Sequence, residues 1–266
     1  MLHQKSLHRN NVVVRGDGEH ALVLAHGFGC DQNMWSRLEP YLEDFRLVLF
    51  DHTGSGDSDI AAFDPVRHGQ LEGYAEDLGE ICDALDLHGA TLVGHSVSCT
   101  IGLMAAADAP ERFANVVMVC PSPCFLNLPG YAGGFERSDL EELIDLMDRN
   151  YIGWAHHLAP LVTGQPADSR LSEELSQSFC STDPITAKTF AEATFLSDHR
   201  DLLGQAQHRV LVLQSARDAL AAPSVGRYVD DKLPHSQLEV IDADGHCLHM
   251  THPAEVAQFI RTFVTG

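Results

Sequence analysis

Apolar residues in this chain gather into short runs that are mostly continuous, with little alternation between apolar and polar positions. Continuous runs of this kind are typical of parallel strands that are covered on both faces of a sheet. The pattern predicts strands at Val12–Val14, Ala21–Ala25, Arg46–Asp51, Ala90–Gly94, Asn115–Cys120, Arg209–Gln214 and Gln237–Asp242. Apolar residues at helical spacing predict a helix over Leu71–Leu87. This alternation of strands and helices indicates the α/β class, with a doubly wound and mostly parallel sheet.

The alternation stops between residues 121 and 207, where no run reads convincingly as a strand. Ser138-Asp139-Leu140-Glu141 has the form of a capping box, and apolar residues at helical spacing follow it. Asp183-Pro184 has the form of an N-cap followed by proline at the first helical position. Further helices are predicted over Tyr151–Val162 and Ser172–Phe179.

This helical segment divides the chain into two parts. We expect residues 1–122 and 206–266 to form one α/β core, and residues 123–205 to form a helical lid inserted into it. The chain has 266 residues, of which 44% are hydrophobic, and this is enough for a sizeable core of that kind.

Acidic residues outnumber basic ones, with 38 Asp and Glu against 17 Lys and Arg and a formal net charge of −21. A surface of this sign repels phosphate backbones, so we expect no nucleic-acid partner. No apolar stretch has the length of a membrane span, and the N-terminus lacks the features of a signal peptide. The seven cysteines, an odd number, suit free thiols in a reducing compartment. These features predict a cytoplasmic protein without a membrane partner.

Candidate chemistry begins where the predicted strand 90–94 ends, in the motif G-H-S-V-S (94–98). A strand that ends in Gly-x-Ser-x-Gly forms the nucleophile elbow of the α/β-hydrolases, and here Ser98 stands where the last glycine would be. A serine hydroxyl becomes a good nucleophile only when a histidine takes its proton and an acid orients that histidine. Asp218 and His246 follow two later predicted strands, in the chain order of those enzymes.

The carboxyl ends of parallel strands meet at one edge of an open sheet, so these three side chains can converge there. We predict that Ser96 is the nucleophile, that His246 is the general base and that Asp218 orients His246. Asp242 and Asp244 are closer to His246 in sequence and are alternatives for the acid. Carboxylates on the same loop as the histidine are more often solvated, which favours Asp218.

An oxyanion hole is the fourth requirement of this chemistry. One donor is expected to be the backbone N–H of Val97, which directly follows the nucleophile near the start of a helix. The other is expected to be the N–H of Phe28 in H-G-F-G (26–29), because glycines on both sides let the backbone turn sharply.

Other motifs carry weaker signals. H-C-L-H (246–249) lacks the further ligands of a zinc site, and C-P-S-P-C (120–124) is not the C-x-x-C of a redox pair. G-S-G (54–56) lacks the rest of a dinucleotide fingerprint and precedes acidic residues that would repel phosphate. We therefore expect no metal and no cofactor.

Further motifs are spread over nearly the whole chain, including the expected lid. They are H-G-F-G-C-D-Q-N-M-W (26–35), G-S-G-D-S-D (54–59), V-G-H-S-V-S (93–98), V-C-P-S-P-C-F-L-N (119–127), N-Y-I-G-W-A (150–155), F-C-S-T-D-P (179–184), F-L-S-D-H-R (195–200) and G-H-C-L-H-M-T-H-P (245–253). In these motifs the chain resembles one subfamily of the α/β-hydrolases. That subfamily contains the bacterial sigma-B stress-response regulatory hydrolase and the plant strigolactone and karrikin receptor hydrolases.

The resemblance implies a four-helix, V-shaped lid over a deep apolar pocket with the triad at its floor. By position, it implies that the pocket is lined by Phe28, His95, Phe125, Phe135, Trp154, Phe190, Phe195 and Leu220. Any one of these aromatic side chains is equally compatible with ordinary lid packing, but as a set they have the composition of a small-molecule site. The plant receptors carry serine at the position of Ser98 and the bacterial regulator carries glycine. We therefore interpret Ser98 as a small side chain that is tolerated where the next helix packs closely.

Two functions are compatible with these features. The first is a serine hydrolase that cleaves an ester, lactone or enol-ether bond of a small apolar compound through an acyl-Ser96 intermediate. The second, which the resemblance implies, is a ligand-sensing protein that hydrolyses its ligand slowly and reports to a partner such as a phosphatase with a PAS domain. An inactive binding protein is disfavoured, because every catalytic position is filled.

Overall fold

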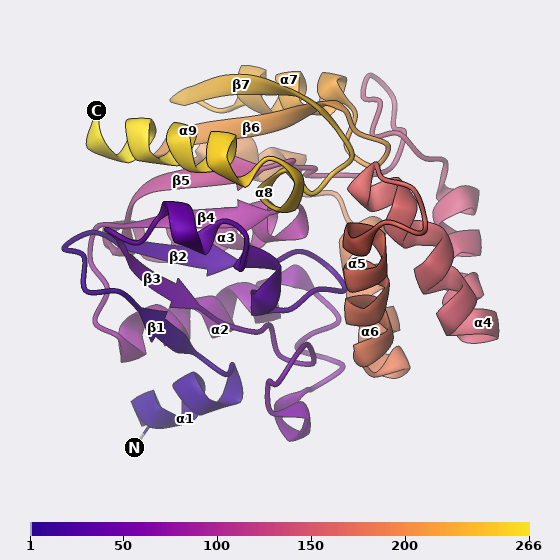
Figure 1. The fold of residues 1–266 in the computed structure, drawn as a ribbon, viewed down its shortest axis with the longest axis horizontal. Coiled ribbons are helices and arrows are strands. Elements are labelled where there is room, and N and C mark those ends of the chain that lie inside the picture. The colour runs from indigo at the N-terminus through magenta and orange to yellow at the C-terminus, as the bar shows by residue number, and fades with distance from the viewer. Residues whose placement is uncertain (1) are drawn as a thin grey trace.

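A single sheet with helices on both faces forms the core of the computed structural model. The structure describes residues 2–266, so residue 1 of the expected core lies outside the described residues. The strand order is β1-β3-β2-β4-β5-β6-β7 (Figure 1). The strands are β1 (Val13–Arg15), β2 (Ala21–Ala25), β3 (Arg46–Leu49), β4 (Ala90–His95), β5 (Phe113–Val119), β6 (Arg209–Arg217) and β7 (Ser236–Asp244). β1 pairs antiparallel with β3, and the other pairs are parallel. The predicted fold class is therefore confirmed.

Differences from the predicted strands are confined to their ends. β2 has the predicted bounds, whereas β3 stops at Leu49 and β6 continues to Arg217. The pairing of β6 with β7 shifts its register between Ser215 and Arg217. This irregular end carries the chain from the sheet directly into the turn that holds Asp218.

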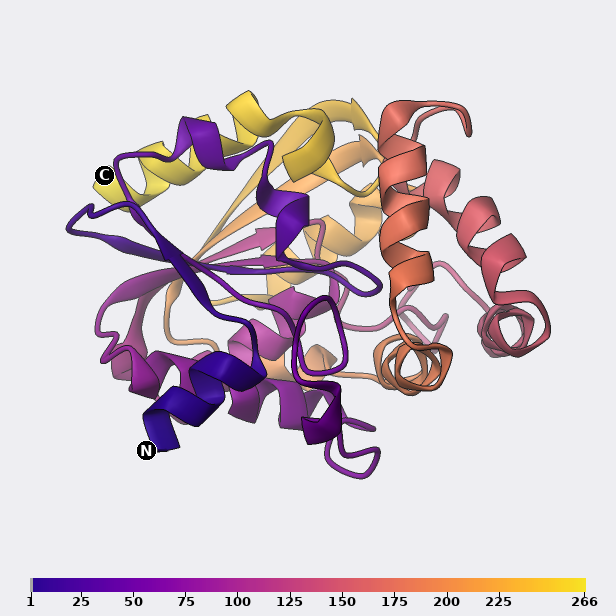
Figure 2. The ribbon, with the colours of Figure 1, turned by 60° about the horizontal axis from the view of Figure 1, so that its bottom comes forward.

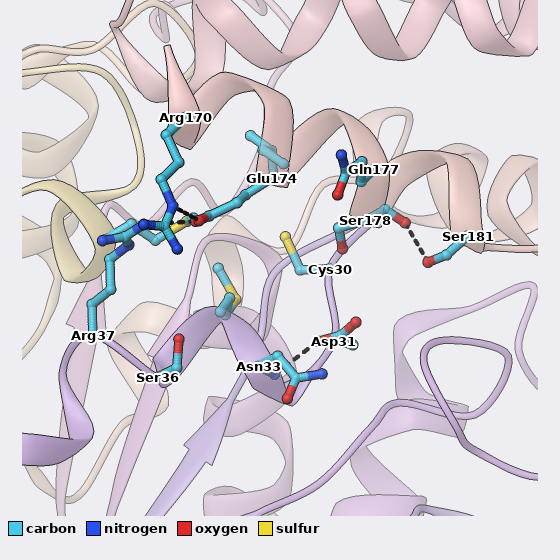
Figure 3. Close-up of a pocket in the computed structure, with 13 residues that line it drawn as sticks. Cys30, Asp31, Asn33, Ser36, Arg37, Arg170, Glu174, Gln177, Ser178 and Ser181 are labelled. Atoms are coloured by element: carbon cyan, nitrogen blue, oxygen red, sulfur yellow. Dashed lines mark hydrogen bonds and ion pairs between the residues drawn. The ribbon is translucent and has the colours of Figure 1, made fainter.

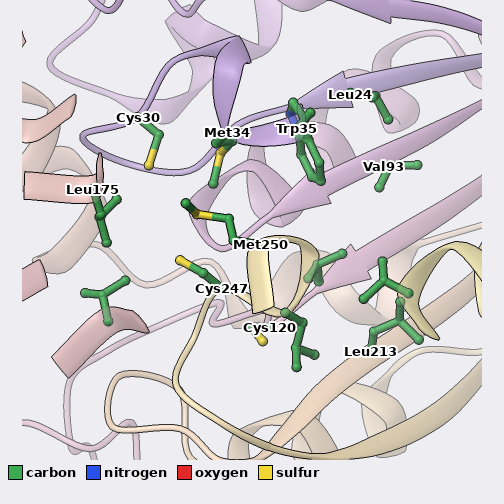
Figure 4. Close-up of a cluster of buried hydrophobic side chains, with 14 of the residues drawn as sticks. Leu24, Cys30, Met34, Trp35, Val93, Cys120, Leu175, Leu213, Cys247 and Met250 are labelled. Carbon is green, nitrogen blue, oxygen red and sulfur yellow. The ribbon is translucent and has the colours of Figure 1, made fainter. Parts of the chain in front are cut away.

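Side chains of the central strands face two separate hydrophobic cores. In β2, Leu22 and Leu24 belong to one core and Val23 to the other. The Val23 face is covered by α2 (Leu71–Ala84), α3 (Val97–Asp108) and α7 (Pro223–Lys232). The Leu24 face is covered by Trp35 and by α8 (Leu248–Thr251) and α9 (Pro253–Thr265) (Figure 4). Burial on both faces explains why the strand sequences are continuously apolar.

Two helices in the N-terminal half of the chain, α2 and α1, differ from the helices that the sequence predicted. α2 ends at Ala84, before the predicted Leu87, because Asp86 takes a left-handed backbone with φ of 52° that a helix cannot continue through. α1 (Leu2–Arg9), which packs against α2, was not predicted from the apolar pattern. Short 3-10 helices occupy Gln32–Trp35, Glu39–Tyr41, Ile60–Ala62, Pro110–Arg112 and Arg200–Gln205.

The segment between β5 and β6 is helical, as expected. It contains α4 (Arg137–Thr163), α5 (Arg170–Ser181) and α6 (Pro184–Phe195). Asn150 has a non-helical backbone and bends α4, so that α4 consists of two helical segments. The three helices stand beside the carboxyl ends of the strands (Figure 2). None of the helices in the described part of the chain is long and apolar enough to cross a membrane.

The expected capping box at Ser138 was wrong, whereas the N-cap at Asp183 is confirmed. α4 is capped by Glu136, whose side chain forms a capping box with Asp139. Position 135 is held in extended pairing with position 126, so the helix begins as soon as that pairing ends and Ser138 lies exposed inside it. Asp183 Oδ1 accepts the N–H groups of residues 185 and 186 at 3.0 and 3.1 Å.

Hydrogen bonds tie the inserted helices to the loops at the carboxyl edge of the sheet. The N–H of His246 donates to the carbonyl of Val162 at the end of α4, at 2.6 Å. Ser178 Oγ of α5 donates to the carbonyl of Gly29, at 3.0 Å. A shift of α4 or α5 would therefore be transmitted to the histidine loop or to the H-G-F-G turn.

Candidate active site

Ser96 stands at a sharp turn between β4 and α3. Its backbone has φ of 56° and ψ of −122°, a sparsely populated conformation for a residue with a side chain. A Cβ on Gly94 would lie 2.6 Å from the carbonyl oxygen of Ser98, so only glycine fits there. The turn therefore lifts Ser96 out of the strand and places it directly before the first residue of α3.

Ser96, His246 and Asp218 form one hydrogen-bonded chain. His246 Nε2 lies 2.8 Å from Ser96 Oγ, and His246 Nδ1 lies 2.7 Å from Asp218 Oδ2. All three residues are buried. The three predicted side chains are thus brought together in the order that nucleophilic catalysis requires.

Asp218 is held in place by more than the histidine. Its Oδ1 accepts the N–H groups of Leu220 and Ala221, at 2.8 and 3.0 Å. Burial alone would raise the pKa of the Asp218 carboxyl, but the charge of His246, its hydrogen bond and these N–H groups together hold the pKa below its usual value. Asp218 is therefore an ionised carboxylate at neutral pH.

The alternative acids lie elsewhere. Arg217 Nη1 donates to Asp242 Oδ1 at 2.8 Å, and Arg217 Nε donates to Asp244 Oδ1 at 2.5 Å. Both carboxylates are exposed at the surface. The guanidinium holds them away from His246, whose Nδ1 faces Asp218.

The H-G-F-G turn lies opposite the elbow. Gly29 has a left-handed φ of 71°, and a Cβ on Gly27 would lie 2.4 Å from His95 Nδ1. Neither the N–H of Phe28 nor that of Val97 donates to another group within residues 2–266. The turn and the start of α3 therefore leave both expected oxyanion donors uncommitted.

Ser98 has a larger role than the sequence suggested. Its Oγ donates to the carbonyl of His26 at 2.5 Å, and His52 Nε2 lies 2.8 Å from the same Oγ. Because the Ser98 hydroxyl gives its only proton to His26, His52 Nε2 must be the donor in the second bond. Burial lowers the pKa of His52 well below its usual value, so this ring is neutral. Ser98 thus connects α3 to the H-G-F-G turn, in addition to being small enough to fit.

A second group of histidines packs against the triad. His95 Nε2 lies 3.0 Å from the carbonyl oxygen of His246, and its ring packs against that of His249 with centroids 4.5 Å apart and an interplanar angle of 57°. His249 in turn packs on Trp35, with ring centroids 4.6 Å apart. Both ring nitrogens of His249 are buried without a hydrogen-bond partner in the described structure. Burial, with the nearby charge of His246, lowers the pKa of His249 to about 3.

Ser96 faces a cavity, and four of the side chains expected around the pocket form part of its wall. They are Phe28, His95, Phe195 and Leu220. The cavity has further lining residues that were not expected from the sequence, namely Cys30, Leu158, Val162, Leu175, Phe179, Thr194 and Cys247. Leu158 and Val162, like Leu175 and Phe179, are one helical turn apart on predicted helices. Helical spacing therefore marked these faces as buried without revealing what they face.

The remaining expected residues do not line this cavity. The rings of Trp154 and Phe190 pack edge-on against Phe28, at 6.0 and 5.7 Å, and of these three only Phe28 lines the cavity. Phe125 packs behind Phe195, at 5.1 Å. Phe135 pairs with Leu126 in the chain that precedes α4. These four aromatic residues support the cavity wall or lie outside it.

The cavity is almost closed. Its free volume is about 20 Å³, close to the space that one water molecule needs. A ligand with several heavy atoms can reach Ser96 only if a lining side chain or one of the helices α4, α5 and α6 moves.

The likeness of this chain to known proteins agrees with the geometry of the site. A sequence profile for the alpha/beta hydrolase fold matches residues 20–253, and the chain belongs to that family. Within it, the chain is 37% identical to the karrikin insensitive 2 receptor IA of Petunia hybrida, over 91% of this chain and 89% of the receptor. It is 36% identical to a strigolactone esterase of Arabidopsis thaliana, over 94% of both proteins. The chain is therefore an enzyme of the α/β-hydrolase class, in the subfamily related to the karrikin and strigolactone receptors.

Two solved structures share the fold of this chain. The hydrolase olei00960 of Oleispira antarctica is 52% identical, with a TM-score of 0.97 over 99% of this chain and 97% of that one. An esterase of Exiguobacterium antarcticum has the same fold at 18% identity, with a TM-score of 0.89 over 96% of this chain and 95% of that one. The fold and the subfamily resemblance expected from the sequence are both confirmed.

Replacing Ser98 tests whether its hydrogen bond to the H-G-F-G turn stabilises the fold. We expect Ser98→Ala to lower the free energy of unfolding by about 1 kcal/mol, because the carbonyl of His26 loses a buried hydrogen bond. Urea denaturation measures the change, and Ser138→Ala, at an exposed position of α4, serves as the control with little effect. Equal urea midpoints for Ser98→Ala and the wild type would show that the hydroxyl contributes nothing beyond its size.

The buried histidines predict acid sensitivity. The unfolded chain protonates His249 near pH 6.5, whereas the folded state does so only near its pKa of about 3. Its contribution to stability is therefore complete above pH 6.5 and is lost as the pH falls toward 3. We expect His249→Leu to reduce the slope of unfolding free energy against pH by up to about 1.4 kcal/mol per pH unit between pH 6 and 4. His88→Gln, at an exposed histidine, should keep the wild-type slope, and an unchanged slope in His249→Leu would contradict the burial argument.

Proposed function

We propose that this protein is a serine hydrolase that cleaves an ester, lactone or enol-ether bond in a small apolar compound. The observation that carries the proposal is the buried chain of hydrogen bonds from Ser96 through His246 to Asp218. The uncommitted N–H groups of Phe28 and Val97, which flank that chain, give it further support. The name of the Arabidopsis relative, a strigolactone esterase, is consistent with ester cleavage.

For an ester or lactone, the steps follow from these positions. Ser96 Oγ attacks the carbonyl carbon while His246 Nε2 takes its proton, and the N–H groups of Phe28 and Val97 bind the negative oxygen. Asp218 stabilises the histidine cation that forms. His246 then gives its proton to the leaving oxygen as the C–O bond breaks, which leaves an acyl group on Ser96. A water molecule that is deprotonated by His246 then attacks the acyl carbon. The bond to Ser96 Oγ breaks, the acid is released, and His246 returns the proton to Ser96 Oγ.

Other aspects of the proposal concern the pocket, the domains and the compartment. The lining by Phe28, Phe179, Phe195 and Leu220 favours an apolar ligand.

We take residues 123–205 as a lid over a core of residues 1–122 and 206–266. The cysteines are free and all but Cys180 are buried, which supports a reducing cytoplasmic location.

Removal of the nucleophile tests the proposal. Ser96→Ala should lower kcat for short p-nitrophenyl esters by roughly 10⁴-fold or more, because it removes the hydroxyl that is hydrogen-bonded to His246 and forms the acyl intermediate. A fluorophosphonate probe, followed by mass spectrometry of the intact protein, should add one adduct to the wild type and none to Ser96→Ala.

The neighbouring serine provides the matched control for this labelling. Ser98→Ala keeps the triad and should still be labelled, because Ser98 is bonded to His26 and His52 and does not face His246. The hydrolase proposal would be wrong if the folded wild type neither reacts with the probe nor hydrolyses any of the esters.

A second candidate function is favoured by the receptors among the relatives. In this version the protein hydrolyses its ligand slowly and reports to a protein partner, such as a phosphatase with a PAS domain. The bonds of α4 to His246 and of α5 to Gly29 support it, because a ligand at Ser96 could displace the lid surface through them.

The partner hypothesis predicts ligand-dependent binding. A phosphatase encoded beside the gene should be retained by the immobilised protein with a Kd that changes at least about threefold when Ser96 carries a phosphonate. The comparison uses biolayer interferometry, with Ser96→Ala exposed to the same probe as the control. Identical binding of the labelled and unlabelled protein would exclude this route of signalling through that partner.

A further inference from the structure

A groove of about 500 Å³ lies beside the triad cavity (Figure 3). It runs between α5 and residues 30–37, which follow the H-G-F-G turn, and we call it the α5 groove. Ligand sites commonly have volumes of about 300–1,000 Å³, so the groove has the size of a binding site. The triad cavity, at about 20 Å³, does not. Any ester that reacts at Ser96 must therefore occupy more space than the triad cavity offers.

Cys30 and Leu175 separate the two spaces. Both side chains are buried, and each lines the α5 groove as well as the triad cavity. The barrier between the two spaces is thin at this point, because it consists of the small Cys30 side chain and of one residue of α5, Leu175. Because the same two side chains line both spaces, we expect a different rotamer of Leu175, or a small shift of α5, to join the groove to the cavity above Ser96. The α5 groove is thus adjoining space with room for the rest of a substrate.

The groove has an apolar inner wall and a basic outer end. Met34 and Met250 lie with Cys30 along the inner wall (Figure 4). At the outer end, Glu174 Oε2 accepts from Arg37 Nη2 at 2.7 Å, and Glu174 Oε1 accepts from Arg170 Nε at 2.8 Å. Two guanidinium groups therefore share one carboxylate, which leaves an excess of positive charge in a chain whose net charge is −21.

The bonding of these charged groups leaves donors for a ligand. Each guanidinium has five N–H donors, and Glu174 accepts from one nitrogen of each. Asp31, the other acid of the groove, accepts the N–H of Asn33 at 2.7 Å and lies away from the two arginines (Figure 3). The basic end of the groove is therefore suited to a carboxylate, which guanidinium groups bind with paired hydrogen bonds.

We propose that the α5 groove binds a carboxylate carried by the substrate whose ester or lactone bond is cleaved at Ser96. This inference rests on the proposed hydrolase function and modifies its substrate class: the part of the compound in the triad cavity is apolar, and the part in the α5 groove carries the carboxylate. The apolar part of the substrate crosses between Cys30 and Leu175, and the carboxylate binds Arg37 and Arg170.

Matched series of esters test the inference. The p-nitrophenyl monoesters of unbranched dicarboxylic acids are compared, at each chain length, with the neutral p-nitrophenyl alkanoates. At the chain lengths that reach the groove, Arg37→Gln should lower kcat/KM for the carboxylate ester about tenfold and for the neutral ester less than about twofold. Arg149→Gln, which removes an exposed arginine of α4 paired with Asp145, is the control and should change neither value.

A second pair of variants tests whether the substrate passes Leu175, which separates the α5 groove from the triad cavity. Leu175→Trp should lower kcat/KM for long carboxylate esters more than for the acetate, whereas Leu161→Trp, at an exposed position of α4, should not. The inference is overturned if Arg37→Gln leaves the ratio of carboxylate to neutral ester unchanged at every chain length while the esters are hydrolysed. Absence of hydrolysis and of Ser96 labelling in the wild type would instead reject the hydrolase function itself.

Discussion

The backbone of Ser96 is the constraint on which the rest of the site depends. A left-handed residue at the end of a central strand costs about 1–3 kcal/mol, and the surrounding structure must hold it there. Pairing of β4 with β2 and β5 fixes one side of the turn. On the other side, the N–H of Ser96 donates to the carbonyl of Val119 at 2.9 Å, and Gly94 lets the first turn of α3 lie against the strand.

Three contacts then hold the H-G-F-G turn in relation to that elbow. Ser98 bonds to the carbonyl of His26, the His95 ring fills the space beside Gly27, and Ser178 bonds to the carbonyl of Gly29. Each contact comes from a different part of the fold, namely α3, the end of β4 and α5. The position of the Phe28 N–H is therefore set by the sheet, by α3 and by α5 together. Movement of α5 affects access to Ser96 and the geometry of the proposed oxyanion hole at the same time.

The sheet and the triad could be predicted because both depend on local patterns. Parallel strands covered on both faces must be continuously apolar, and residues that follow such strands must meet at one edge of the sheet. The role of Ser98 could not be predicted, because its partners His26 and His52 lie far from it in sequence. The capping of α4 at Glu136 depends likewise on the pairing of residues 126 and 135.

Pocket residues were the hardest to predict. Burial of an aromatic residue in the lid follows from helical spacing, but the rotation of the helix decides whether that residue faces the cavity or another ring. Trp154 is fully buried behind Phe28, while Leu158, one turn further along α4, lines the cavity. The approach of α5 to residues 30–37 depends on how the helices between β5 and β6 are placed on the sheet, so the α5 groove left no sequence signal either.

A crystal structure of the protein with a phosphonate bound to Ser96 tests the central claim most directly. The adduct mimics the tetrahedral intermediate, so its negative oxygen marks the place where charge develops during hydrolysis. We predict a covalent bond to Ser96 Oγ and an oxygen about 2.7–3.1 Å from the backbone nitrogens of both Phe28 and Val97. An adduct on another residue, or an oxygen that reaches neither N–H, would contradict the roles assigned to the elbow and the H-G-F-G turn.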